Sequence, residues 1–158
     1  MALKSNRFEE STDISFFYNA GTATRGGVVV LDNTNASGAA LDQGANLVKY
    51  AQVTATSVPV GILLNDVVNK DLTKTHLNQQ KNEVQKGGKV TVLTRGWVVT
   101  NMIDGNPTPG QACFASSGTA GYVSATSAVG GGLGIGRFMS NKDADGYAKV
   151  FVNLPNKF

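Results

Sequence analysis

The segment KVTVLTRGWVVTNMI, residues 89–103, carries the clearest strand pattern in the chain. Val90 and Val92 alternate with their neighbours, and a period of two is what a strand with one buried face requires. Gly96 interrupts the pattern, and a glycine inside a strand pattern predicts a β-bulge. Trp97 and the two valines after it resume the pattern, so the segment predicts a long strand with a bulge near its middle.

Shorter strand candidates lie on both sides of this segment. They recur about every 8–12 residues with turn residues between them, which is typical of an antiparallel sandwich or barrel. The chain of 158 residues has 18 valines and 14 threonines but only three glutamates, a composition that favours strands over helices. We therefore expect a mainly β fold, an antiparallel β-barrel or sandwich. The candidate strands are 28–31, 47–53, 58–68 (bent at Gly61), 89–103, 111–116, 121–125, 135–139 and 147–155.

The chain divides into an extended N-terminal arm, residues 1–24, and a single β-rich domain, residues 25–158. Residues 69–86 have the weakest pattern, because their few apolar residues fit neither a helix stripe nor a strand. This stretch predicts one long loop excursion from the domain.

The arm is rich in large apolar residues. A strand over 14–18 would be apolar on both faces, and such a strand left exposed would aggregate. The arm is therefore expected to pair with a sheet edge of a partner protein or of a neighbouring subunit, in which case the fold would not need it. The alternative is that the arm is the first strand of its own domain. The candidate interface residues are Phe8, Ile14, Phe16, Phe17 and Tyr18.

The last predicted strand has two different faces. Ala148, Val150, Val152 and Leu154 suit a core, whereas Tyr147, Lys149, Phe151 and Asn153 occupy the other face. Aromatic side chains on a nominally outer face indicate a subunit contact, so Tyr147 and Phe151 join the candidate interface residues. A strand buried on both faces is the alternative. We expect a homo-oligomer, a homotrimer before a dimer.

The glycine-rich stretch VGGGLGIGRFMS, residues 129–140, resembles a phosphate loop only superficially. Its glycines are spaced G-x-G-x-G, Arg137 stands where the third glycine of a dinucleotide fingerprint belongs, and no helix pattern follows. We interpret the stretch as a turn, or as a place where another backbone comes close.

The sequence contains no catalytic, cofactor-binding or metal-binding constellation. Cys113 lies in a strand pattern and His76 in a polar stretch, with no third group to complete a nucleophile and base. The segment NKDADG, residues 141–146, matches half of a calcium loop, but position twelve is Val152 instead of a glutamate. Asp and Gly there predict a hairpin turn. We expect no cofactor and no enzymatic activity.

The charge and hydropathy patterns argue against two classes of partner, nucleic acids and membranes. The net charge is only +3, and the basic excess between residues 70 and 95 has no interleaved aromatic residues for base stacking, so we expect no nucleic acid. That stretch is read as solvated or as facing an acidic protein. The N-terminus lacks a signal-peptide core and no window reaches the length of a membrane span, which predicts synthesis in the cytoplasm and no membrane contact.

Several segments together resemble a known family: VPVGILLNDVVNKDL, VQKGGKVTVLTRGWVVTN, PTPGQACFA and IGRFMSNKDADGYAKVFVNLP, with FEESTDISFFYN and TRGGVVV before them. They are similar to the small virion proteins of tailed bacteriophages, notably the capsid decoration (cement) proteins of cyanophage-type heads. The resemblance implies a β-rich structural protein that binds the major capsid protein on the outer surface of an assembled shell, as a trimer or dimer. It supplies no site residues.

Two other classes of function remain open at this point. One is a different virion component, such as a tail-tube or head–tail connector subunit. The other is a small carbohydrate-binding β module, which would carry aromatic residues in loops. Trp97 lies within a predicted strand, which counts against the second class.

Overall fold

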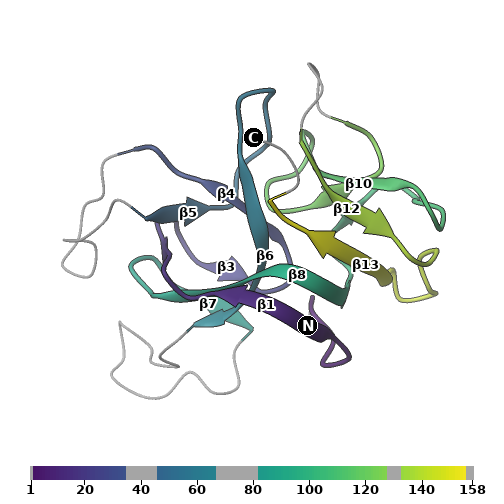
Figure 1. The fold of residues 1–158 in the computed structure, drawn as a ribbon, viewed down its shortest axis with the longest axis horizontal. Coiled ribbons are helices and arrows are strands. Elements are labelled where there is room, and N and C mark those ends of the chain that lie inside the picture. The colour runs from purple at the N-terminus through teal and green to yellow at the C-terminus, as the bar shows by residue number, and fades with distance from the viewer. Residues whose placement is uncertain (1, 35–45, 67–81, 128–132, 156–158) are drawn as a thin grey trace.

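A computed structural model describes residues 2–34, 46–66, 82–127 and 133–155. Every regular element in these residues is a β-strand, so the predicted mainly β fold is confirmed (Figure 1). No helix that could span a membrane is found in the described part of the chain. The strands are β1 Phe8–Asp13, β2 Phe17–Tyr18, β3 Ala23–Thr24, β4 Val28–Leu31, β5 Leu47–Lys49, β6 Pro59–Asp66, β7 Glu83–Val84, β8 Val90–Thr100, β9 Ile103–Asp104, β10 Ala112–Ala115, β11 Val123–Ser124, β12 Gly134–Phe138 and β13 Ala148–Asn153.

The strands form one large sheet and one small one. The large sheet has the order β2-β5-β4-β6-β8-β13-β12-β10-β11-β9, and β1 joins it by pairing with β8; β3 and β7 form the small sheet. Most pairs are antiparallel, as expected, but β2 runs parallel to β5 and β9 parallel to β11. The path of strands does not return to its beginning, so the described strands do not close into the barrel that was one of the two predicted forms.

Strand β8 is the centre of the fold. Its first half pairs with β6, its second half with β13, and its other edge with β1. The bulge predicted at Gly96 is present as a shift of register, and the extra residue lies on the partner strand, where Glu10 falls between the pairs of Glu9 and Ser11. A Cβ atom on Gly96 would lie closer than 3.0 Å to the carbonyl oxygen of Phe8. The glycine therefore permits the close approach of β1.

Strands β4 and β6 of the large sheet bury side chains on both faces. In β4, Val28 and Val30 belong to one core cluster and Val29 to another, because successive side chains of a strand point to opposite faces. In β6, Ile62 and Leu63 divide in the same way. The larger cluster also takes residues from β10 to β13, so the two halves of the sheet curl around it. The smaller cluster includes Ala23 and Val84 of the small sheet.

The arm differs from the strand predicted over residues 14–18. The long strand of this region is β1, Phe8–Asp13, and only Phe17–Tyr18 of the predicted strand is extended and paired. Leu3, which precedes β1, is buried in the larger cluster. Tyr18, which follows β1, is buried in the smaller cluster, so residues on either side of β1 lie in the core of the same chain.

Candidate capsid and subunit interface

A row of side chains crosses five neighbouring strands. The register places Phe8 of β1 opposite Trp97 of β8, and Trp97 opposite Phe151 of β13. It continues from Phe151 to Arg137 of β12 and from there to Ala112 of β10. Residues directly opposite one another in a sheet project from the same face. Three aromatic rings and a guanidinium group therefore stand in line on one face of the sheet.

A second row lies beside the first. Lys149 pairs with Val99, and the N–H of Met139 donates a hydrogen bond of 2.8 Å to the carbonyl of Lys149. Each of these three residues is two positions from a member of the first row on its own strand, so it projects from the same face. The Nζ atom of Lys149 lies 3.8 Å from the centroid of the Trp97 ring. This cation–π contact joins the two rows.

The turn between β12 and β13 borders the rows. Asp143 accepts hydrogen bonds from the N–H groups of Tyr147 at 2.8 Å and Asp145 at 3.0 Å, as in the predicted hairpin turn. Lys4 Nζ donates to the other carboxylate oxygen at 3.0 Å and lies 4.2 Å from the centroid of the Tyr147 ring. The N–H of Tyr147, and then Lys4, lower the pKa of Asp143. The turn is thereby tied to the start of the chain.

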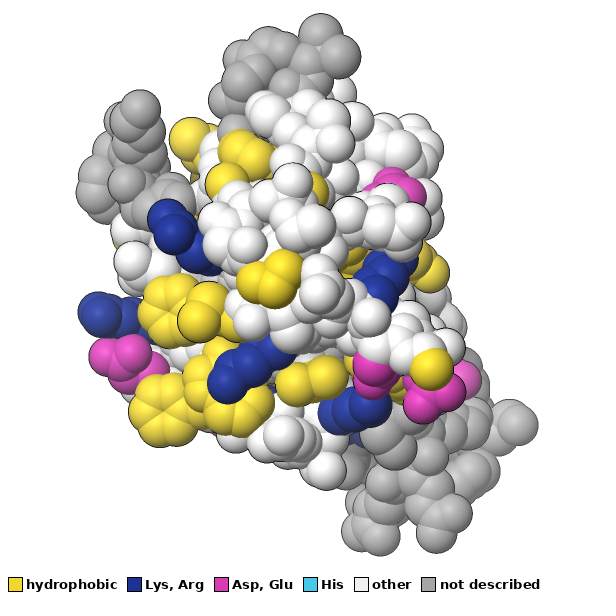
Figure 2. All heavy atoms as spheres, turned by 90° about the vertical axis from the view of Figure 1, so that its right-hand side faces the viewer, with side chains coloured by type: hydrophobic (Ala, Val, Ile, Leu, Met, Phe, Trp, Pro, Cys, Tyr) yellow, Lys and Arg dark blue, Asp and Glu magenta, His cyan; other side chains and the backbone are white. Residues whose placement is uncertain are grey.

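These residues form one surface, which we call the aromatic face. Phe8 and Met139 are the most open of its apolar members, at 53% and 52% exposed, whereas Trp97, Tyr147 and Phe151 are half-buried. In Figure 2, hydrophobic side chains gather on the side of the molecule that lies to the right in Figure 1, and Lys and Arg side chains lie between them. The aromatic face consists of Phe8, Trp97, Val99, Arg137, Met139, Tyr147, Lys149 and Phe151.

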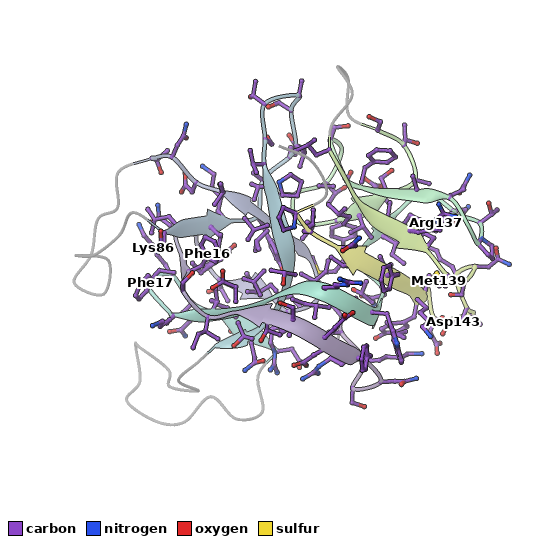
Figure 3. All side chains as sticks on the ribbon, in the orientation of Figure 1. Phe16, Phe17, Lys86, Arg137, Met139 and Asp143 are labelled. Atoms are coloured by element: carbon purple, nitrogen blue, oxygen red, sulfur yellow. The ribbon has the colours of Figure 1, made fainter. Side chains whose placement is uncertain are left out.

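The other predicted interface residues lie elsewhere, at what we call the β2 end. Ile14 is 52% exposed, Phe16 is half-buried against the smaller core cluster, and the ring of Phe17 lies 5.9 Å from Lys89 Nζ. The aromatic face and the β2 end lie at opposite ends of the molecule (Figure 3). Figure 3 labels Phe16, Phe17 and Lys86 at one end and Arg137, Met139 and Asp143 at the other.

Tyr18 departs from the prediction that it faces a partner. It is only 2% exposed and belongs to the smaller core cluster. Its N–H donates to the carbonyl of Gly88, and its carbonyl accepts from Gly87. Burial raises the pKa of its hydroxyl group. We therefore leave Tyr18 out of the candidate interface.

The final strand has the two faces that the sequence predicted. Ala148, Val150, Val152 and Leu154 are buried in the larger cluster, whereas Lys149 and Phe151 are half-buried on the outer face and Asn153 is exposed. The strand is therefore not buried on both faces.

The segments considered for chemistry have structural roles where the structure describes them. Gly136 lies in β12, and a Cβ atom there would lie closer than 3.0 Å to the carbonyl oxygen of Phe151, so the predicted close approach of another backbone is confirmed. Residues 129–132 of the glycine stretch and His76 lie outside the described residues. Cys113 is fully buried, and burial raises the pKa of its thiol. In the part of the chain that is described, no three His, Cys, Asp or Glu residues are placed to hold a metal ion.

Five members of the aromatic face were not among the predicted interface residues: Trp97, Val99, Arg137, Met139 and Lys149. Each was assigned correctly to a strand or its end, but nothing in its own segment shows which residues of other strands it faces. The alternation of side chains along the last predicted strand identified Tyr147 and Phe151 as outward-facing. The same alternation places Trp97 and Val99 on one face of β8, and it was the signal that could have identified them.

The chain is similar to a known protein family and to a solved structure. A family model described as "Structural cement protein (E217 gp24/Pam3 gp6)" matches residues 10–153. A chain from the solved structure "The capsid of Myoviridae Phage XM1" has the same fold, with a TM-score of 0.51 and 16% sequence identity; the match covers 95% of this chain and 85% of that chain. A search of curated protein sequences finds no match.

The family match spans nearly all of the described sheet, from β1 to the end of β13. The function implied by that family is stabilisation of a phage capsid, and the β-rich fold fits it. The chain belongs to the family of structural cement proteins of phage capsids.

Proposed function

We propose that this cement protein binds the outer surface of an assembled capsid through its aromatic face, with the major capsid protein as its partner. The observation that supports the proposal is the row of Phe8, Trp97 and Phe151, which stays partly exposed although it lies on paired strands. Aromatic side chains are enriched at the centres of protein interfaces. The protein is then a component of the virion surface, made in the host cytoplasm, with no enzymatic activity of its own.

The aromatic face is built to bind with little loss of conformational freedom. Trp97 is flanked by β1 on one side and β13 on the other, and Lys149 Nζ lies 3.8 Å from the centroid of its ring. Phe151 is likewise flanked by two strands. Side chains already held by their neighbours lose less entropy when a partner covers them. Truncation of such an anchor typically costs about 2 kcal/mol of binding free energy or more.

The arm, residues 1–24, is proposed to take part in attachment without leaving its own sheet. Strand β1 is exposed along most of its length and supplies Phe8 to the aromatic face. Leu3 and Tyr18, on either side of β1, belong to the core. A chain that starts at Thr22 is therefore expected to lose stability, measured by circular dichroism, as well as its binding to capsids. A shortened chain that stays folded and loses only binding would separate the arm from the fold.

The β2 end is proposed to join copies of the chain into a homotrimer. Ile14 is open to solvent, and Phe17 lies on β2, the first strand of the sheet path, next to Lys89. A protein that contacts both a shell and its own copies needs two separate surfaces, and the two ends of this molecule provide them (Figure 3). Light scattering at micromolar concentration tests this proposal, with Ile14→Ser and Phe17→Ser expected to shift trimers toward monomers. A monomeric native protein would oppose it.

The test of capsid attachment uses capsids that lack the cement protein. The double variant Phe8→Ser, Phe151→Ser is added to them, and bound protein is measured by co-sedimentation and by electron microscopy. Leu31→Ser is the matched control, because Leu31 is an exposed apolar residue, 46% exposed, outside the aromatic face. We expect the control to bind like the native chain and the double variant to lose binding while keeping its thermal transition. Native-like binding by the double variant would remove the aromatic face from the proposal.

A further inference from the structure

We propose that the partner surface covered by the aromatic face is acidic, with carboxylate groups that pair with Arg137 and Lys149. This inference rests on the proposed function and adds the chemistry of the partner. It starts from the positions of these two cations, which lie within the rows of apolar side chains and not outside them.

The two cations differ from others nearby in their partners. Lys4 is paired with Asp143 at 3.0 Å, and Arg95 with Glu10 at 3.1 Å. Arg137 and Lys149 have no carboxylate within ion-pair distance among residues 2–34, 46–66, 82–127 and 133–155. The face therefore carries a positive charge that no carboxylate of the described residues neutralises by an ion pair.

The positions of Arg137 and Lys149 mean that a partner covering the aromatic face also covers their charges. Arg137 is directly opposite Phe151, and Lys149 is stacked over Trp97. A partner that contacts these aromatic rings must also take water away from the two charged groups. Covering a charged group without a partner is costly, and a carboxylate on the opposing surface is the group that offsets this cost in a protein interface. Arg137 can receive a carboxylate through two parallel N–H donors.

The same charges argue against a second copy of this chain as the occupant. In a two-fold contact each patch meets its own copy, so Arg137 and Lys149 would face cations of the same kind. They also favour a protein over a nucleic acid. Phe8 and Met139 are both more than half exposed, at 53% and 52%, and such apolar groups need an apolar surface to cover them. A phosphate backbone does not provide that surface.

The experiment measures binding to capsids that lack the cement protein over a range of salt concentrations. Arg137→Gln and Lys149→Gln each remove one charge from the aromatic face. Lys86→Gln removes the same charge from an exposed site at the opposite end of the molecule (Figure 3). Thermal unfolding of each variant confirms that the sheet is intact.

We expect the affinity of the native chain to fall as salt rises from about 0.05 to 0.5 M, because the Debye length shrinks from over 10 Å to a few ångströms. Arg137→Gln is expected to bind about tenfold more weakly at low salt and with a shallower dependence on salt. Lys86→Gln is expected to match the native chain. Native-like affinity and salt dependence in both aromatic-face variants would overturn the inference.

The result separates this inference from the proposed function. If Phe8→Ser with Phe151→Ser abolishes binding while Arg137→Gln has no effect, the inference fails and the proposed attachment stands. If neither change affects binding, the aromatic face is not the attachment surface. Binding of short duplex DNA that is lost in Arg137→Gln would also overturn the inference, because it would identify phosphate as the anion recognised.

Discussion

Replacing Gly96 by alanine should detach β1 from the rest of the sheet. Gly96 has a φ of 140°, a conformation that only glycine adopts readily, and β1 lies directly beside it, with Glu9 as its partner in the sheet. A methyl group there would lie closer than 3.0 Å to the carbonyl oxygen of Phe8 and 3.2 Å from the N–H nitrogen of Glu10. Either the backbone of β8 or that of β1 has to move.

The structure provides a control that separates the two causes of strain. Gly105 also has a positive φ, 76°, but nothing lies within 4 Å of the position of its Cβ atom. Gly105→Ala should therefore cost about 1–2 kcal/mol from backbone strain alone. Gly96→Ala adds the loss of several β1–β8 hydrogen bonds at about 1 kcal/mol each, which brings the total to about 4 kcal/mol.

Urea unfolding of both variants measures the difference in the free energy of unfolding, and thermal unfolding gives their melting temperatures. For a chain of this size each kcal/mol lowers the melting temperature by about 2–4 °C, so Gly96→Ala should melt about 10 °C lower and the control about 4 °C lower. Hydrogen exchange should become faster at the amides of β1 in Gly96→Ala, and binding to capsids should weaken because Phe8 is displaced. Equal stabilities of the two variants would refute the argument that close approach at Gly96 holds β1.

Three further predictions follow from buried groups. Burial favours the neutral form of Asp32, but hydrogen bonds from Lys49, Thr34 and Asn19 outweigh it and lower the pKa from 3.8 to about 2. The resulting stability, about 2 kcal/mol, is present above pH 4 and should be lost as the pH falls through 2. Free energies of unfolding measured at a series of acidic pH values should show this loss in the native chain and not in Asp32→Asn. Tyr50→Phe should cost about 1–3 kcal/mol in urea unfolding, because the hydroxyl group donates to the Thr24 carbonyl at 2.6 Å and accepts from the Gly27 N–H at 3.0 Å. Cys113 should not react with a thiol reagent in the folded protein, since its buried thiol has a raised pKa; rapid labelling without denaturant would contradict this.

The parts of the fold that were predictable depend on local patterns. The apolar run at Val28–Leu31 and the alternation at Ala148–Asn153 mark strands because burial of one or both faces selects residues at each position. Strand β1 has no such pattern, since its sequence FEESTD is mostly polar and its side chains are mostly exposed. It is extended because β8 pairs with it, and that pairing is a property of the assembled sheet.

The candidate site was predictable only in part, for the same reason. Phe8 and Phe151 were singled out separately, one from the arm and one from the last strand. Their common position depends on the register of β1 and β13 against Trp97, and a slip of one residue would turn each to the opposite face. The open path of the sheet, instead of a barrel, likewise depends on contacts between distant segments.

The position of β8 between β1 and β13 has a consequence for synthesis of the protein. During translation, residues 8–13 stay unpaired until β8 has emerged from the ribosome. Strand β8 has all its neighbouring strands only after residue 153 has left the exit tunnel. Pairing between such distant segments makes folding slow, since the chain must close long loops before those contacts stabilise it. Until then Trp97 and Val98 belong to an incomplete sheet. The aromatic face is thus complete only after β13 has joined the sheet, so a nascent chain without β13 lacks the proposed binding surface.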